Sequence, residues 1–569
     1  MQFRCKQCQA PFTVTDDDRA FLKKLSPIIG GVTLDLPEPL HCPDCRQLRR
    51  QAAVNQMHLH RNTCGLTGKS VISNFRKDSG FTVYAREAWW GDGWDPLSYG
   101  RDYDFNKSFF EQYKELSRAV PYPSLTTAYT YDENCDYTNY SGKNKNCYLI
   151  FDSDESRDCY YCYSINGCKD CIDCHRVRRS ELTAHAMDCL QCYNCSFVQD
   201  CSNCADSLFL KNCTSCKHCI MCSNLTNKEY HIENKPVSKE DFERVQKSLA
   251  SREALAGARA HFDAFVLQFP QKSMRGFMNE NCTGDYLLQS KNAYKCFDGE
   301  SLWDCRYSYQ SPLPLKNSMD TEQCGEAENM YESSNCVYNA HTVLFSASCW
   351  PCRYELYCTF CFSCSNCFGC CSLKHKQYCI LNKQYTQGEY EALVKKIVEH
   401  MRHDGGDAMN LSAASGSWGQ FFPASLALFP YNETVAADHC ALTMEEAAGL
   451  GYGWAEREDD LEGTSEEVFV PPSTIVETED DATKKRLLCF SCHHPYKITV
   501  QELALLRRKN LPLPVECFLC RHRARMARRN PRKLYGRKCE NCRKGIETTY
   551  SPERPEKVFC EECYVKTVF

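Results

Sequence analysis

The cysteines between Asn134 and Glu229 follow a six-residue frame, which constrains the fold more than any other feature of the chain. Counting from Asn134, all sixteen cysteines of this stretch fall in the second or the fifth position of the frame. The first position is mostly Asn or Asp. A short fixed period with small apolar residues in register is typical of a solenoid, whose turns stack on one another. Asn and Asp suit its corners, because they tolerate left-handed backbone.

The frame also bears on what these cysteines do. Free cysteine is a small and commonly buried hydrophobe, so we expect the sixteen side chains to pack inward, with ligation of metal or iron–sulfur clusters as the alternative. The spacing of the inward positions does not fit a regular strand. Inward positions three residues apart do not match the period of two in a strand. Very short strands with frequent corners would reconcile the two.

A second cysteine-rich stretch repeats the first. The segment Cys213–Lys235 aligns with Cys361–Lys383 at a constant offset of 148 residues. Each copy then carries a helix-capping pattern, Ser238 with Asp241 and Thr386 with Glu389. We expect these helices to run to about Phe265 and His400 and to cover the ends of the repeats, because an open repeat stack needs a cap.

The second copy is less regular than the first. Cys282, Cys324 and Cys336 share one phase of the frame, whereas the eight cysteines of the frame from Cys349 onward lie one residue out of it. An insertion near His341 is the simplest cause.

Twelve further cysteines form three double CxxC motifs near the two ends of the chain. They are Cys5, Cys8, Cys42 and Cys45; Cys489, Cys492, Cys517 and Cys520; and Cys539, Cys542, Cys560 and Cys563. Two CxxC pairs separated by a short loop place four thiolates tetrahedrally around Zn²⁺, and four protein thiolates leave no open position for catalysis. The spacing therefore predicts about three structural zinc ions.

The first two motifs are one module used twice. Both read CxxC-x2-Pro-aromatic-x-aliphatic-Thr, and both reach the second pair through Leu-Pro-x-Pro. This module resembles a zinc-binding domain of the zinc-ribbon or treble-clef type that occurs in many bacterial proteins, and the third motif resembles another short bacterial zinc ribbon. The whole arrangement resembles an uncharacterised family of cysteine-rich, zinc-ribbon-flanked proteins from candidate-phylum bacteria. The resemblance covers nearly all of the chain and implies no particular activity.

A basic segment follows the second zinc motif. Nine of the eighteen residues from 521 to 538 are basic, namely Arg521, Arg523, Arg525, Arg528, Arg529, Arg532, Lys533, Arg537 and Lys538. A cationic helix on a zinc ribbon commonly holds phosphates, so these residues are the candidate nucleic-acid contacts. The alternative is a solvated helix or one docked on the acidic stretch Glu456–Asp481 of the same chain.

Composition narrows the class of protein. The 569 residues carry 44 cysteines and a net charge of −5. The sequence contains no HExxH, GxSxG or GxGxxG motif, so nothing in it identifies an enzyme. We find no signal peptide or membrane-spanning apolar run and therefore expect a cytoplasmic protein with reduced thiols.

We expect a mainly β, multidomain chain. Two cysteine-rich β-solenoid-like repeats, each followed by a capping helix, would be flanked by small zinc ribbons. The expected units are a zinc ribbon (1–57), an aromatic-rich α+β segment whose rings form a core (58–133), a first solenoid with its helix (134–270), a second (271–402), an irregular arm and acidic linker (403–486), and two further zinc ribbons (487–530 and 531–569).

Three functions fit these features. The first is a non-enzymatic structural-zinc scaffold that contacts nucleic acid or a ribonucleoprotein through its basic C-terminal ribbons. The second is a redox or metal protein whose repeat cysteines bind iron–sulfur clusters or store metal. The third is a protein–protein adaptor. No membrane partner and no small-molecule substrate is indicated.

Overall fold

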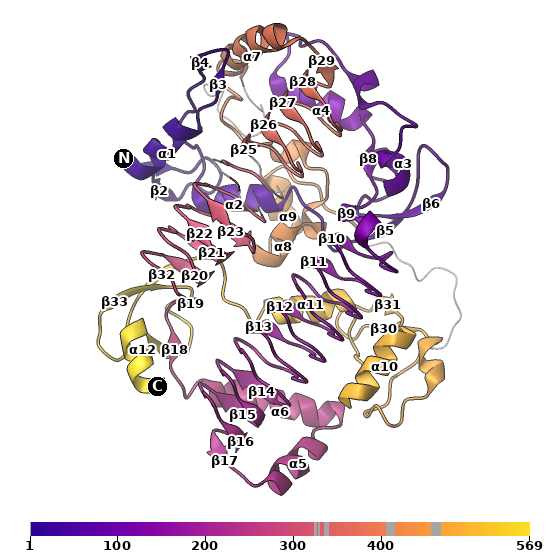
Figure 1. Ribbon diagram of the computed structural model, residues 1–569, viewed down its shortest axis with the longest axis vertical. Helices are drawn as coiled ribbons and strands as arrows, with labels where there is room; N and C mark the ends of the chain where they lie inside the picture. The colour runs from indigo at the N-terminus through magenta and orange to yellow at the C-terminus, as the bar shows by residue number, and fades with distance from the viewer. Residues whose placement is uncertain are drawn as a thin grey trace.

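The computed structural model describes residues 2–323, 327, 330–334, 341–405, 416–456 and 468–568. Two long ladders of short parallel strands form its frame, with helices and the terminal cysteine modules arranged around them (Figure 1). Cys324, Cys336 and much of the acidic stretch at 456–481 lie outside the described residues. The chain is therefore multidomain and rich in short strands.

The first ladder is built mostly from parallel pairs with a register of twelve residues. The exceptions are Thr127 with Ser141 at its start, fourteen residues apart, and an antiparallel pair at its end. Asn139 pairs with Phe151, His175 with Met187, and Leu208 with Ile220, and isolated bridges continue the same spacing between these pairs. Its strands are β9 (Thr127–Ala128), β10 (Asn139–Gly142), β11 (Phe151–Asp154), β12 (His175–Arg178), β13 (Met187–Leu190), β14 (Leu208–Lys211), β15 (Lys217–Ser223), β16 (Glu229–Ile232) and β17 (Lys235–Pro236).

A left-handed residue at every third position resolves the mismatch between the frame and the strand period. From Tyr140 to Tyr230 each third residue has a positive φ, and the Asn and Asp of the first frame position are among them. From Ser141 to Cys222 the residue after each left-handed corner is buried, whereas Leu225, Lys228 and His231 at the end of the ladder are not. All sixteen frame cysteines are consequently buried in one cluster with Ile150, Ile165 and Val177. The expectation of inward packing is confirmed, and the corners are twice as frequent as the Asn and Asp positions alone indicated.

The second ladder has the same register over its later part. His341 pairs with Arg353 and Arg353 with Ser365, again twelve residues apart. Its strands are β19 (Gly276–Phe277), β20 (Gly284–Leu288), β21 (Cys296–Glu300), β22 (Leu302–Trp303), β23 (Tyr309–Ser311), β24 (Leu315–Lys316), β25 (His341–Leu344), β26 (Arg353–Leu356), β27 (Ser365–Phe368), β28 (Gln377–Ile380) and β29 (Lys383–Gln384).

The expected extra residue is present before β25, because Tyr331 bridges Leu344 at a spacing of thirteen. A second spacing of thirteen, between Leu302 and Leu315, was not expected from the cysteines.

Helices cover the far end of each ladder (Figure 1). Helix α7 (Gln387–Met401) begins with the capping box of Thr386 and Glu389 and contacts β28. The helix expected after Ser238 is instead two helices, α5 (Lys239–Ser248) and α6 (Arg252–Val266), because Ser251 caps a second helix start. None of the helices in the described part of the chain is both long and apolar enough to cross a membrane.

The aromatic-rich segment forms a core, as expected. It contains β5 (His60–Thr63), β6 (Ser70–Ser73), β7 (Val83–Tyr84), α3 (Arg86–Trp90), α4 (Phe109–Ala119) and β8 (Tyr122–Pro123). Trp89 and Phe109 are fully buried, whereas Trp90 and Phe105 remain partly exposed. The rings of Trp89 and Phe109 pack against Phe362 and Phe368 of the second ladder, so this segment covers one side of it.

The arm is more ordered than expected. Helices α8 (Val435–His439) and α9 (Met444–Gly449) belong to a cluster with Leu48 of the N-terminal module. Within the described part of the acidic stretch, Ile475 is buried and the carbonyl of Ser473 accepts a hydrogen bond from the amide of Arg252. Residues 471–475 therefore pack on α6, and Asp480 pairs with Arg507, so this part of the chain is not an extended linker.

Three small modules carry the double CxxC motifs. The first contains β1 (Gln2–Arg4), β2 (Pro11–Thr13), α1 (Asp16–Leu25), β3 (Ile28–Ile29), β4 (Val32–Thr33) and α2 (Pro43–Gln51). The second contains β30 (Leu487–Leu488), β31 (Pro495–Tyr496), α10 (Val500–Lys509) and α11 (Phe518–Met526). The third contains β32 (Tyr535–Lys538), β33 (Gly545–Thr548), β34 (Val558–Phe559) and α12 (Glu561–Val568), and β34 pairs with β18 (Gln271–Lys272) at the start of the second ladder.

Candidate functional site

The twelve cysteines of the double CxxC motifs converge in three groups of four. Within each group the four sulfur atoms lie within 4.8 Å of one another. The Sγ atoms of Cys8 and Cys42 are 3.7 Å apart, and those of Cys492 and Cys517 are 3.6 Å apart. A tetrahedral zinc ion with Zn–S bonds of about 2.3 Å needs sulfur atoms separated by roughly 3.8 Å. Each group can therefore hold a metal ion.

Each group owes its shape to the same turn after its first CxxC. The residue that follows the second cysteine is left-handed in all three modules, with φ of 59° at Gln9, 59° at His493 and 65° at Arg543. The amides of these residues donate to the carbonyls of Cys5, Cys489 and Cys539 at 2.8–3.0 Å. The turn folds the chain back so that both sulfurs face the second pair.

Backbone amides favour the thiolate form of these cysteines. The amides of Cys42 and Cys560 donate to the Sγ atoms of Cys5 and Cys539, each at 3.3 Å. Although burial opposes the change, hydrogen bonds from the backbone of Cys542 and Cys560 lower the pKa of Cys539 to about 6. Thiolates are the form that binds metal. Burial raises the pKa of Cys563 in the same group, so only part of the group is held as thiolate without an ion.

The basic segment is mostly turned toward the rest of the chain. Six of its nine basic side chains form ion pairs with carboxylates of this chain: Arg521 and Arg525 with Asp173, Arg528 with Asp263, Arg529 with Asp188 and Asp298, Arg532 with Asp298, and Arg537 with Glu540. The side chains of Arg523, Lys533 and Lys538 are exposed. These carboxylates belong to the ladders, to α6 and to the third module, and none of them to the acidic stretch in the part of the chain that the structure describes.

The docking of the second module repeats that of the first. Arg521 and Arg525, one and five residues after Cys520, each donate to Asp173 of the first ladder at 2.7 Å. Arg46 follows Cys45 in the same way and pairs with Asp320 of the second ladder at 2.5 Å, and Arg50 lies 3.6 Å from the same carboxylate. Allowing for the extra residue before β25, Asp173 and Asp320 occupy equivalent ladder positions. The second module is thus matched to the first ladder, and the first module to the second ladder.

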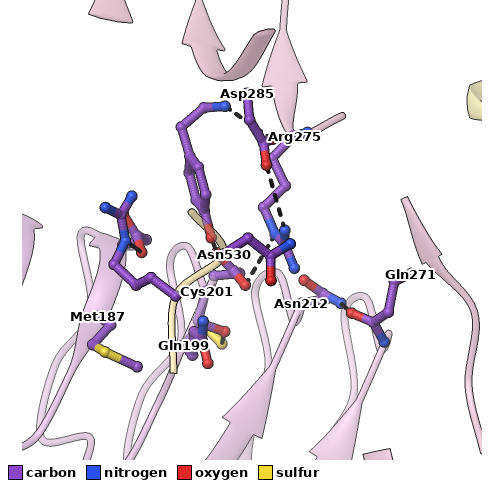
Figure 2. Close-up of polar contacts among 12 residues, drawn as sticks. Met187, Gln199, Cys201, Asn212, Gln271, Arg275, Asp285 and Asn530 are labelled. Atoms are coloured by element: carbon purple, nitrogen blue, oxygen red, sulfur yellow. Dashed lines mark hydrogen bonds and ion pairs between the residues drawn. The ribbon is translucent and has the colours of Figure 1, made fainter. Parts of the chain in front are cut away.

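A buried ionic network joins the two ladders. Asp188 and Asp200 come from the first ladder and Asp285 and Asp298 from the second, and they pair with Arg176, Arg275, Arg529 and Arg532. Figure 2 shows part of this junction, with Arg275 beside Asp285 and the amide of Asn212 directed to Gln271. Breaking a buried pair leaves an uncompensated charge, so such networks resist rearrangement.

The aromatic ring of Tyr286 at the junction also contacts this network. The guanidinium of Arg529 lies 4.8 Å from the ring centre of Tyr286, whose hydroxyl donates to Asp200 at 2.8 Å. Although burial opposes the change, the charges of Arg176, Arg529 and Arg532 hold the pKa of Asp298 well below its ordinary value. The junction therefore keeps this carboxylate ionised. The ladder aspartates have no sequence motif that reveals them, beyond their place at corner positions.

The ladder thiols are satisfied by the backbone. Cys213 donates to the carbonyls of Lys211 and Cys222, and Cys361 donates to those of Thr359 and Cys370, so equivalent cysteines of the two ladders make equivalent hydrogen bonds. One group adds a carboxylate to two such thiols. Cys349, Glu355 and Cys361 place three ligand atoms within 4.8 Å of one another inside the second ladder. The frame of cysteines did not single out Glu355.

A cavity of about 650 Å³ lies between the first ladder, α6 and the second module. Its lining includes seven basic side chains and three acidic ones. Phe197 and Phe209 stack at 4.8 Å, and the guanidinium of Arg259 lies 4.8 Å from the ring centre of Phe209. Burial lowers the pKa of Lys211 to about 8. Arg521, Arg525 and Arg528 of this lining already pair with Asp173 and Asp263.

Comparison with known proteins adds little to this description. No protein-family model matches the chain, and no curated protein matches it. One solved structure that matches in part is described as a "putative acetyltransferase" from Desulfovibrio desulfuricans G20, with 8% identity and a TM-score of 0.09. The match covers 37% of this chain and 65% of the other chain, less than two thirds of its length. At this TM-score the likeness carries no argument about fold or activity.

Proposed function

We propose that the protein is a non-enzymatic binding scaffold in which three structural zinc ions fold the terminal modules and two cysteine-lined β-solenoids form the frame. The convergence of twelve cysteines in three groups of four carries this proposal. All-thiolate sites favour zinc and have no position left for a substrate. The twelve-residue parallel register supports the solenoids, since each repeat then stacks on the next.

The repeat thiols support packing over iron–sulfur ligation. Cys189 and Cys201 each donate to a carbonyl two residues earlier, at 3.1 and 3.2 Å, and such bonds satisfy buried thiols without a cluster. A protein of this kind is colourless. Brown colour and acid-labile sulfide in protein purified without oxygen would instead favour the redox alternative.

Metal content tests the structural-zinc proposal. We expect Cys489→Ser, Cys5→Ser and Cys539→Ser each to lose one zinc ion from the full chain, and to loosen only the module concerned. Cys201→Ala is the matched control, because it removes a buried ladder thiol outside these groups. It should keep its metal and cost on the order of 1–2 kcal/mol in unfolding free energy. Unchanged metal content in all three ligand variants would contradict the proposal.

Nucleic-acid contact is the second candidate, and it now rests on Arg523, Lys533 and Lys538. These three side chains are exposed, whereas their basic neighbours meet carboxylates of the same chain. Binding of basic side chains to the phosphate backbone of a nucleic acid weakens steeply as the salt concentration rises. Fluorescence anisotropy with single-stranded RNA and duplex DNA at low salt tests it on the full chain.

The variant for this test replaces Arg523, Lys533 and Lys538 with Ala. Its control replaces the exposed Lys114, Lys239 and Lys247, which removes the same charge elsewhere. A drop in affinity of similar size for every sequence, in the first variant alone, would support nucleic-acid binding. No salt-sensitive binding by the unmodified chain would leave the protein–protein adaptor as the function of the scaffold.

A further inference from the structure

Glu355 occupies an inward position of the second ladder that the repeat otherwise gives to small or apolar residues and cysteine. It lies in β26 and is fully buried, as are Cys349 and Cys361. Cys349 and Cys361 are twelve residues apart and so stack in successive repeats, while Glu355 is six residues from each and faces them across the interior. Its ligand oxygen and the two sulfurs lie within 4.8 Å of one another.

The burial of this carboxyl group needs a physical explanation. Neither oxygen of Glu355 has a hydrogen-bond partner of normal geometry among the described residues. A buried carboxylate without partners is costly, so it either carries a proton or meets a cation.

The first ladder shows what the same place looks like without the carboxylate. The offset of 148 residues matches Cys349, Glu355 and Cys361 to Cys201, Ser207 and Cys213. Ser207 is equally buried, but its hydroxyl donates to the carbonyl of Ala205 at 2.6 Å. Among the described residues of the first ladder no group of three ligand atoms converges in this way. One residue, Glu355, thus separates a packed interior from a three-ligand group.

We propose that Cys349, Glu355 and Cys361 bind one thiophilic divalent ion, such as Zn²⁺, inside the second ladder. Two sulfurs and one carboxylate oxygen are ligands that zinc accepts, and thiolates select it over Mg²⁺ and Ca²⁺. Binding releases the two thiol protons and the carboxyl proton to solvent and needs no oxidant or reductant. The buried thiols of Cys352 and Cys364 lie three residues from the two cysteine ligands and are the candidates for a fourth ligand.

Metal stoichiometry of the full chain tests this inference separately from the terminal modules. Protein purified without oxygen and equilibrated with Zn²⁺ should hold four ions by elemental analysis, against three in Glu355→Gln and in Glu355→Ser. Ser207→Ala is the matched control in the first ladder and should keep four. Cys489→Ser should lose one ion of its own, and its combination with Glu355→Gln should lose two. Loss at a module and loss at Glu355 are thereby distinguished.

Two further measurements guard against a variant that merely misfolds. With Co²⁺ in place of Zn²⁺, the sulfur-to-metal charge-transfer absorption should fall by about one site's share in Glu355→Gln, while the far-ultraviolet circular dichroism stays unchanged. Ser207→Glu should create the equivalent site in the first ladder and add one ion. Equal metal content in the unmodified chain, Glu355→Gln and Glu355→Ser would overturn the inference, and Glu355 would then be a protonated core side chain.

Discussion

The guanidinium of Arg529 lies 2.7 Å from the carboxylate of Asp298, and its Nε lies 2.9 Å from the carboxylate of Asp188. Asp188 belongs to the first ladder, Asp298 to the second, and Arg529 to the chain just after α11. One side chain therefore connects three parts of the molecule that are more than 100 residues apart in the sequence. A residue that appeared suited to holding phosphates is occupied in joining the two ladders.

Arg529→Met should destabilise the junction strongly. The substitution leaves Asp188 and Asp298 buried with fewer partners, and breaking such a pair costs about 3–5 kcal/mol. Chemical denaturation followed by circular dichroism measures the loss. Arg523→Met is the control, because Arg523 is an exposed arginine in the preceding helix, and it should change stability by less than about 0.5 kcal/mol. Equal effects of the two substitutions would show that the network contributes little.

Asp173→Asn and Asp320→Asn should each release one module and leave the other in place. Asp173 holds Arg521 and Arg525, whereas Asp320 holds Arg46 and Arg50. Limited proteolysis should then cut near the second module in the first variant and near the N-terminal module in the second. The same cleavage pattern in both variants would contradict the matched pairing of modules and ladders.

The junction should weaken at acidic pH. The pKa of Asp298 is held below its ordinary value in the folded protein, so its contribution is present above the unfolded pKa of about 3.9 and is lost as pH falls through the folded value. Unfolding free energy measured from pH 6 to pH 3 should fall less steeply in Asp298→Asn than in the unmodified chain. Metal release at low pH acts in both proteins and so cancels in the comparison. A steeper fall in the variant would contradict the assigned sign.

The corner conformation can be tested at an exposed position. Asn203 has φ of 54° and its side chain is exposed. A substitution there therefore tests the backbone conformation and not the packing of a side chain. Asn203→Gly should be close to neutral, while Asn203→Val should cost about 1–2 kcal/mol, because the left-handed region is unfavourable for a residue with a branched Cβ. Thermal unfolding of the two variants checks this. Equal melting temperatures would mean that the corner relaxes at little cost.

The sequence by itself determined the local units of this protein. The cysteine frame indicated which side chains face inward, and the three double CxxC motifs identified the twelve cysteines that converge in groups of four. Both follow from short-range spacing, because a corner at every third residue or a turn between two cysteines is decided by a few neighbouring residues. The capping pattern likewise placed the start of α7, although it missed the break between α5 and α6.

Only the tertiary structure decided which charges meet. In the sequence, Arg521 and Arg525 look like part of a free cationic surface. The fold places Asp173, 348 residues from Arg521, beside them. The sequence does not single out Glu355, and only the register places it opposite Cys349 and Cys361. Aspartates and glutamates at ladder positions look alike in sequence, and their partners depend on how ladders and modules dock. Burial then decides their chemistry, because a charge removed from water must find a partner, a proton or a metal ion.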